Sequence, residues 1–253
     1  MNEQLIKANL NLYAIFKNLE DLIAYDKESA ELAKNWDISI QFNVNNGPKA
    51  FVAFKNGVCT VEKGKCKNPS VILYFTSPEH LNKMFDNKAN PIPLKGFTKL
   101  GFLSKEFPKV TDKLAYFLKP TDELLKNEEY LKINTRFTLT TAAYATSVLA
   151  DEDDLSKISA SHMGEGTVML RVLPDGPAVN ITVKGKRLYP AKGIAENPEA
   201  MISMKDYKVA NDFLNGKIDA FTAITAGDII MYGQIPLVDN LSLILDRISI
   251  YVS

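Results

Sequence analysis

The chain has 253 residues, 46% hydrophobic and 24% charged, which is typical of a globular protein with one large or two ordinary domains. Lys plus Arg and Asp plus Glu both number 30, so the basic surplus with which nucleic-acid binders neutralise phosphates is absent. No run of about 18 apolar residues could span a membrane, and residues 1–12 lack the apolar stretch of a secretory signal, so we expect a cytoplasmic protein with at most transient membrane contact.

The first half of the chain starts with a helical segment and continues as strands. Apolar residues recur at helical spacing over residues 3–34. Further along, Asn46-Gly47-Pro48 and Asn56-Gly57 are turn sequences, and the apolar runs around them predict short strands. The predicted strands cover residues 38–44, 50–54, 58–62 and 71–75, the last of them buried on both faces.

A second helical region follows these strands. Ser77-Pro78-Glu79 predicts a helix start, because serine caps free amides, proline fits the first turn and glutamate lies near the positive end of the helix dipole. This helix should run to about Phe85. The remaining elements are an irregular stretch around Pro91 and Pro93, a strand or turn over residues 97–103, and a final helix over 110–118 that Pro120 ends.

The second half repeats this order of elements. Residues 121–150 are predicted to be helical, and we interpret the acidic run that follows, residues 151–154, as a solvated turn. Alternating apolar runs and turn sequences then predict strands, and helices follow them. The strands cover residues 167–173, 179–183, 187–189, 201–204 and 229–232, and the helices cover 206–214 and 218–226, with a last helix capped by Asp239.

Two dipeptides recur at one offset and indicate that the two halves are copies. Gly47-Pro48 returns as Gly176-Pro177, and Asn68-Pro69 returns as Asn197-Pro198, so that Pro48 and Pro177, and Pro69 and Pro198, are each 129 residues apart. Hairpins followed by helices favour an α+β fold over a parallel sheet. We therefore predict two tandem similar domains, each a mainly antiparallel sheet covered by helices.

We place the domain boundary near Pro120, with one domain over residues 1–120 and the other over 121–253. No Gly/Ser-rich linker separates them, so we expect the domains to pack on each other as a fused pseudo-dimer, with further oligomerisation left open.

The sequence offers no catalytic or metal-binding motif. Cys59 and Cys66 lack the spacing of a zinc or redox site, and we interpret them as reduced thiols. His80 and His162 belong to no metal-binding array, and no nucleophile elbow or phosphate-binding glycine motif is present. Residues 151–154 lack the ligand pattern of a calcium loop. We therefore predict no catalytic residue, no metal and no cofactor.

The second half is instead rich in adaptable apolar residues. Methionine fills irregular shapes and is frequent at apolar binding sites, although ordinary core packing would use the same residues. We take ten of these residues as candidates for ligand binding. They are Met201, Met204, Phe213, Phe221, Ile224, Ile229, Met231, Leu237, Leu241 and Leu245.

From about residue 176 to residue 250 the chain resembles the sterol carrier protein 2 family of lipid-transfer proteins. The resemblance depends on the helix end Asn215-Gly216-Lys217, the apolar strand framed by Gly227-Asp228 and Gly233, and the leucine-rich segment 241–245. The first half looks like a more divergent copy, with prolines in place of part of a short helix. In the second copy, Asp228 stands where the family has lysine.

The resemblance implies a sheet covered by helices around an apolar tunnel, with a C-terminal helix as a lid. A lipid, fatty-acyl or other hydrophobic small molecule would bind there without catalysis. Burial of about 16 carbons at roughly 0.8 kcal/mol per CH₂ would stabilise such a complex by on the order of 10 kcal/mol before entropy losses.

Two other functions stay open. Both copies could be packed solid and form a pseudo-dimeric interaction module, which an exposed apolar patch would favour. Alternatively, an enzyme could use the apolar pocket for its substrate, and a convergent cluster of polar groups would favour that function. The polar candidates are Arg171, Arg187, Tyr189, Asp228 and Tyr232.

Overall fold

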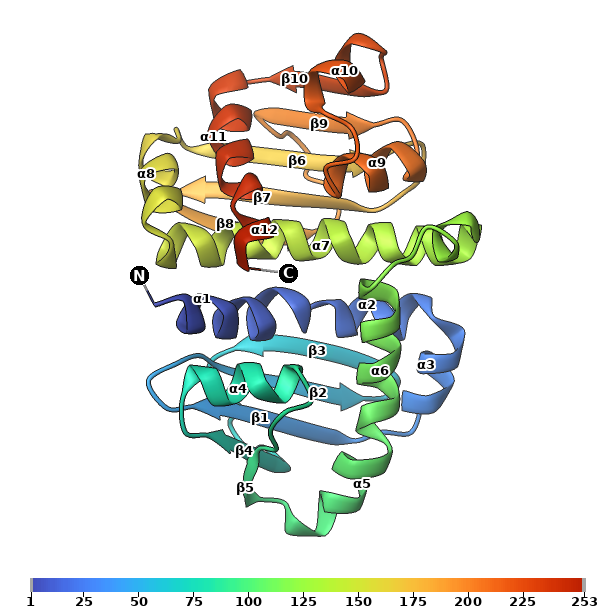
Figure 1. Cartoon of the computed structure of the whole chain (residues 1–253), viewed down its shortest axis with the longest axis vertical. Coiled ribbons are helices and arrows are strands. Elements are labelled where there is room, and N and C mark those ends of the chain that lie inside the picture. The colour runs from blue at the N-terminus through green and yellow to red at the C-terminus, as the bar shows by residue number, and fades with distance from the viewer. Residues whose placement is uncertain (1, 252–253) are drawn as a thin grey trace. The chain divides into compact units, whose positions relative to one another are not determined.

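The computed structural model describes residues 2–251 and divides into two compact units, residues 2–119 and residues 120–251 (Figure 1). Each unit contains a five-stranded sheet, with strand order β3-β2-β1-β4-β5 in the first and β10-β9-β6-β7-β8 in the second. Read from the other edge, the second order is that of the first. In each sheet one central pair is parallel and the other three pairs are antiparallel. The predicted α+β class and the mainly antiparallel sheets are confirmed.

The first unit follows the predicted order of elements closely up to residue 85. The long N-terminal helical segment contains a π-helical turn at Asn11–Ile15 and breaks at Asp26, which caps the next helix. Its helices are α1 (Glu3–Leu10), α2 (Asn18–Tyr25), α3 (Lys27–Ala33), α4 (Pro78–Phe85), α5 (Leu100–Lys105) and α6 (Phe107–Leu118). Its strands are β1 (Ile38–Val44), β2 (Lys49–Lys55), β3 (Val58–Lys63), β4 (Val71–Phe75) and β5 (Ile92–Lys95).

The second unit begins with one long helix and then repeats the pattern. Its helices are α7 (Glu128–Glu152), α8 (Asp154–His162), α9 (Tyr207–Leu214), α10 (Ala220–Thr225), α11 (Ile235–Asp246) and α12 (Ile248–Tyr251). Its strands are β6 (Gly166–Val172), β7 (Ala178–Lys184), β8 (Arg187–Lys192), β9 (Ala200–Met204) and β10 (Ile229–Gly233). Single turns of 3-10 helix lie at Phe97–Lys99 in the first unit and at Leu124–Lys126 in this one.

Helices gather on one face of each sheet, and the core lies between them and that face (Figure 1). In β1 the side chains of Ile40 and Phe42 are buried on the covered face, and in β6 those of Val168 and Leu170 are their counterparts. Side chains alternate between faces along a strand, so the intervening residues line the opposite face. That face carries half-exposed polar residues such as Thr182.

The helix start at Ser77 is confirmed by its geometry. The Ser77 hydroxyl accepts a hydrogen bond from the His80 backbone N–H at 3.2 Å, and Pro78 occupies the first turn of α4. An oxygen at this position satisfies an amide that has no partner within the helix, which is why serine here fixes where α4 begins.

Three predictions of local structure were wrong. Residues 97–103 are helical, and the strand is β5, because an edge strand tolerates Pro93 without losing a ladder hydrogen bond. Residues 151–154 are not a solvated turn, because α7 runs to Glu152, Asp153 is buried and α8 begins at Asp154. Asp239 caps no helix, because α11 already begins at Ile235 with Pro236 in its first turn.

Candidate functional site

Five of the ten predicted ligand-binding residues belong to the covered side of the second sheet. Met204 of β9 and Ile229 of β10 are paired and buried, and Met231 lies on the same face two residues further on. Leu237 and Leu241 of α11 are at most 1% exposed. A Cβ atom at Gly166 would lie 3.0 Å from the Leu237 side chain, so α11 packs directly on the start of β6.

The other five lie elsewhere, so the set does not form one lining. Met201 is three residues from Met204 on β9, and an odd spacing on a strand places it on the opposite face. Phe221 is 80% exposed and Ile224 is 42% exposed, because the six-residue helix α10 buries only Ala223. Phe213 and Leu245 are half-buried. The ten residues are close in sequence, but the alternation of side chains along the strands places them on different faces.

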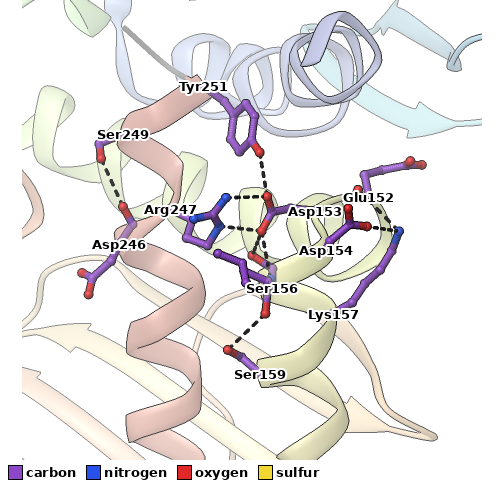
Figure 2. A network of polar contacts seen from close by, with 11 residues as sticks. Glu152, Asp153, Asp154, Ser156, Lys157, Ser159, Asp246, Arg247, Ser249 and Tyr251 are labelled. Atoms are coloured by element: carbon purple, nitrogen blue, oxygen red, sulfur yellow. Dashed lines mark hydrogen bonds and ion pairs between the residues drawn. The ribbon is translucent and has the colours of Figure 1, made fainter. Parts of the chain in front are cut away.

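A buried polar network at the C-terminal end of α11 was missed by the sequence analysis (Figure 2). Asp153 has no exposed surface, and its carboxylate accepts two bonds from Arg247, at 2.5 Å from Nε and 2.7 Å from Nη2. The Tyr251 hydroxyl donates to the same carboxylate at 2.6 Å. Asp153 also caps α8, accepting from the backbone N–H of Ser156 at 2.9 Å and from its hydroxyl at 2.8 Å.

This network fixes the charges of its members. Burial alone would raise the pKa of Asp153, but the hydrogen bonds from Arg247, Tyr251 and Ser156 together hold it well below its usual range. The hydrogen bond to Asp153 raises the pKa of Arg247, and burial raises the pKa of Tyr251. The carboxylate is therefore ionised at neutral pH and ties α11 and α12 to the junction of α7 and α8. We call this set, Asp153, Arg247 and Tyr251, the C-terminal lock.

The first unit has the same helix cap without the lock. Asp26 accepts from the backbone N–H of Ser29 at 2.9 Å and from its hydroxyl at 2.6 Å, as Asp153 does from Ser156. There, however, the final helix contributes Lys113, which pairs at 2.5 Å with Glu28, a carboxylate that is 78% exposed. That hydrogen bond raises the pKa of Lys113. A solvated single-point ion pair stabilises little, so the two final helices are anchored unequally.

Two sequence signals could have indicated the lock. Asp-x-x-Ser occurs at both helix junctions, as Asp26 to Ser29 and as Asp153 to Ser156, which predicts an N-cap in place of a loop. Arg247 is also the single basic residue after Lys217, in a segment that is otherwise strongly apolar. A lone arginine in such a segment needs an acidic partner if it is to be buried.

The polar candidates for catalysis do not converge. The Asp228 carboxylate pairs with Lys205 at 3.0 Å, and Arg171 donates to the Ser203 hydroxyl at 2.9 Å. Tyr189 and Tyr232 are more than half exposed and stand on β8 and β10, the two opposite edges of the sheet. Arg187 begins β8 and is exposed. Residues placed this far apart give no shared reaction centre.

Residues 2–251 contain neither a candidate metal site nor a membrane-spanning helix. No group of three His, Cys, Asp or Glu side chains in this range could hold a metal ion. Within the same range, no helix is both long and apolar enough to cross a membrane.

The comparison with protein families gives a match in the first half of the chain. The family model described as "SCP-2 sterol transfer family" matches residues 16–100, most of the first unit. We expected the clearer resemblance in the second half, so the copy taken as divergent is the one that the family model matches. No curated protein matches the chain.

Several solved structures are similar at low identity. A conserved hypothetical protein of Thermus thermophilus, described as "possibly sterol carrier protein", is 19% identical over 44% of this chain and 86% of its own, with a TM-score of 0.34. Sterol Carrier Protein 2 Like 2 of Aedes aegypti is 13% identical, over 42% and 94%, with a TM-score of 0.31. The sterol carrier protein domain 2 of Helicoverpa armigera is 17% identical, over 51% and 92%, with a TM-score of 0.33. Residues 16–100, about a third of the chain, match the model of the SCP-2 sterol transfer family.

Proposed function

We propose that this protein binds or transfers a lipid, fatty-acyl or other hydrophobic small molecule, without catalysis, between a sheet and its covering helices. The observation that carries the proposal is the match of residues 16–100 to a family of sterol transfer proteins. The apolar covered faces are the chemistry that such a ligand needs, since an acyl chain gains its binding energy from burial alone.

We further propose that the second unit is the one that takes the ligand. In the first unit the covered face is occupied by aromatic rings, with Phe16 at 5.3 Å from Phe42 and 4.7 Å from Phe85 between ring centroids. Phe42 also stacks on Phe75 at 6.3 Å. At the matching register positions the second unit has Leu170 and Met204. These flexible side chains can rearrange around a ligand more readily than rigid rings.

The test is native mass spectrometry of the purified full chain before and after organic extraction. We expect a bound mass of a few hundred daltons that extraction removes. One ligand per chain would agree with a single competent unit, and two would show that both units bind.

A pair of matched variants tests which of the two units binds the ligand. Met204→Trp and Phe75→Trp place an indole at equivalent, fully buried positions of the two sheets. We expect Met204→Trp to weaken the binding of a fluorescent fatty acid about tenfold or more, because the indole would take the space of about two CH₂ groups of the ligand, each worth roughly 0.8 kcal/mol. Phe75→Trp should change it little, and circular dichroism shows whether both variants are folded.

A chain without bound lipid that also takes up no fluorescent fatty acid would contradict the proposal and favour the packed interaction module. Loss of binding in Phe75→Trp with normal binding in Met204→Trp would move the site to the first unit.

A further inference from the structure

The first unit exposes a cluster of apolar side chains at its edge strand and the helix that follows. Ile92 is 42% exposed, Leu94 55%, Phe97 63% and Leu100 42%, all within nine consecutive residues. Ile92 and Leu94 both belong to β5, with Leu94 at the point where the pairing of β5 with β4 shifts register. Phe97 and Leu100 are three residues apart in the helical segment that follows. Single exposed apolar residues are ordinary on protein surfaces, whereas a cluster of four marks an interaction site. We call residues 87–105 the β5–α5 tip.

The charges of the β5–α5 tip all have one sign. It contains Lys88, Lys95, Lys99 and Lys105, and no aspartate or glutamate. Asp86 and Glu106 stand just outside the tip and pair with Lys88 and Lys109, whereas Lys95 donates to the neutral carbonyl of Pro69. Exposed apolar side chains among lysines fit a partner that is apolar within and negatively charged at its surface.

The equivalent end of the second unit has the apolar residues without the positive charge. Phe221, Ile230 and Tyr232 are between 57% and 80% exposed there. Residues 216–235 nevertheless hold a single lysine, Lys217, against Asp219 and Asp228. The two ends therefore resemble each other in exposed apolar side chains and differ in charge. A comparison of the two ends can show whether binding to a partner needs the positive charges or only the apolar side chains.

The composition of the tip also distinguishes a lipid surface from a protein partner. Protein interfaces are enriched in arginine and aromatic residues and depleted in lysine. Residues 87–105 contain four lysines and no arginine, tyrosine or tryptophan, and their aromatic residues are Phe97 and Phe102. Lysine side chains can lay their methylene stems along an apolar surface while their ammonium groups stay at the level of charged headgroups.

We propose that the β5–α5 tip docks the protein on an anionic phospholipid bilayer, with Leu94 and Phe97 entering the interface and the lysines against the phosphates. Lysines close to an anionic surface each contribute about a fivefold gain in partitioning, and the apolar side chains add to it. The docking does not require a ligand inside the protein, so it stands apart from the proposed function.

The test is co-sedimentation of the full chain with phosphatidylcholine vesicles, with and without phosphatidylglycerol. We expect binding only when phosphatidylglycerol is present, and its loss at high salt. The triple variant Lys95→Gln, Lys99→Gln, Lys105→Gln should lower the partition coefficient by about 100-fold. Leu94→Ser with Phe97→Ser, both exposed in the folded chain, should weaken binding without altering the circular dichroism spectrum.

The matched control is Phe221→Ser with Ile224→Ser at the end of the second unit, which should bind the anionic vesicles like the wild type. Equal binding to neutral and anionic vesicles, or unchanged binding of the lysine variant, would overturn the proposal. A protein that does not bind vesicles would also overturn the proposal. If that protein is a dimer in size-exclusion chromatography, and the Leu94→Ser, Phe97→Ser variant is a monomer, the tip is a protein interface. Bound ligand is measured separately by mass spectrometry, so failure of one proposal is distinguishable from failure of the other.

Discussion

Replacing Arg247 by alanine should lower the free energy of unfolding of the second unit by about 3–5 kcal/mol. The substitution removes both guanidinium bonds to Asp153 and leaves a carboxylate with no exposed surface beside only Tyr251 and Ser156. A buried charge that loses its partner cannot recover the hydration that folding removed. Arg247→Lys should recover part of the loss, because it restores the charge without the two-bond geometry.

Urea unfolding monitored by two probes measures this effect. Trp36 is the single tryptophan of the chain and packs in the first unit against Phe54 at 5.0 Å and Phe102 at 4.7 Å between ring centroids. Its fluorescence reports the first unit, whereas far-ultraviolet circular dichroism reports both. We expect Arg247→Ala to shift the circular dichroism transition more than the fluorescence transition.

Lys113→Ala is the matched control in the first unit. Its partner Glu28 stays solvated, so the loss should be about 0–1 kcal/mol. Equal losses from Arg247→Ala and Lys113→Ala would show that the C-terminal lock adds no stability beyond that of a surface ion pair.

The contribution of Asp153 should depend on pH with a definite sign. Its pKa in the folded protein lies below its value in the unfolded chain, so the stabilisation is present above about pH 4 and is lost as the pH falls towards the folded value. The difference in unfolding free energy between the wild type and Asp153→Asn should therefore be constant near neutral pH and shrink only in acid. A difference that already declines between about pH 8 and pH 5 would contradict the assignment.

The strands and turns could be predicted from the sequence because their signals are local. The alternation in residues 38–44 and the Asn56-Gly57 turn each depend on a few neighbouring residues, and β1, β2 and β3 form where these signals place them. The common offset of the Gly-Pro and Asn-Pro pairs likewise agreed with two sheets of the same strand order.

The C-terminal lock and the lining of the ligand site could not be predicted, because the surroundings of their residues are set by segments that are distant in the sequence. Asp153 stands between Glu152 and Asp154, and only its contact with Arg247, 94 residues further along the chain, separates it from a solvated acidic run. Met201 and Met204 looked equivalent by composition, and their odd spacing already placed them on opposite faces of the predicted strand. Which of the two faces is covered depends on the helices that pack on the sheet. Long-range pairing of this kind leaves little trace in one sequence.

The helix α11 is anchored at both of its ends. Its C-terminal end is fixed by the C-terminal lock. Its N-terminal end follows Gly233 and Gln234, and the Gln234 backbone N–H donates to the Glu199 carbonyl at 2.9 Å. Because Leu237 and Leu241 cover the sheet from this helix, both anchors bear on the apolar face that we propose as the ligand site.

Gly233→Ala should be among the most destabilising single substitutions in the second unit, with a loss on the order of 4 kcal/mol. Gly233 has a φ of +93°, and a Cβ atom there would overlap the Glu199 carbonyl oxygen and lie 2.9 Å from the Ala200 Cα. Both neighbours are backbone atoms of β9 or its approach, so relief requires β10 to separate from β9 and α11 to move with it.

Gly227→Ala is the control, because it imposes the unfavourable backbone conformation on alanine without a steric overlap. Its φ of +74° is equally unfavourable for alanine, but no atom that a new Cβ would meet lies within 4 Å. We expect a loss of about 1–2 kcal/mol there, from the left-handed conformation alone. Gly96→Ala, the counterpart in the first unit with its Cβ 2.6 Å from the Ser70 carbonyl oxygen, should fall between the two and should be visible in Trp36 fluorescence. Equal losses of unfolding free energy for Gly233→Ala and Gly227→Ala would show that β10 can move away from β9 without a further loss of stability. The contact with Glu199 would then not anchor the start of α11.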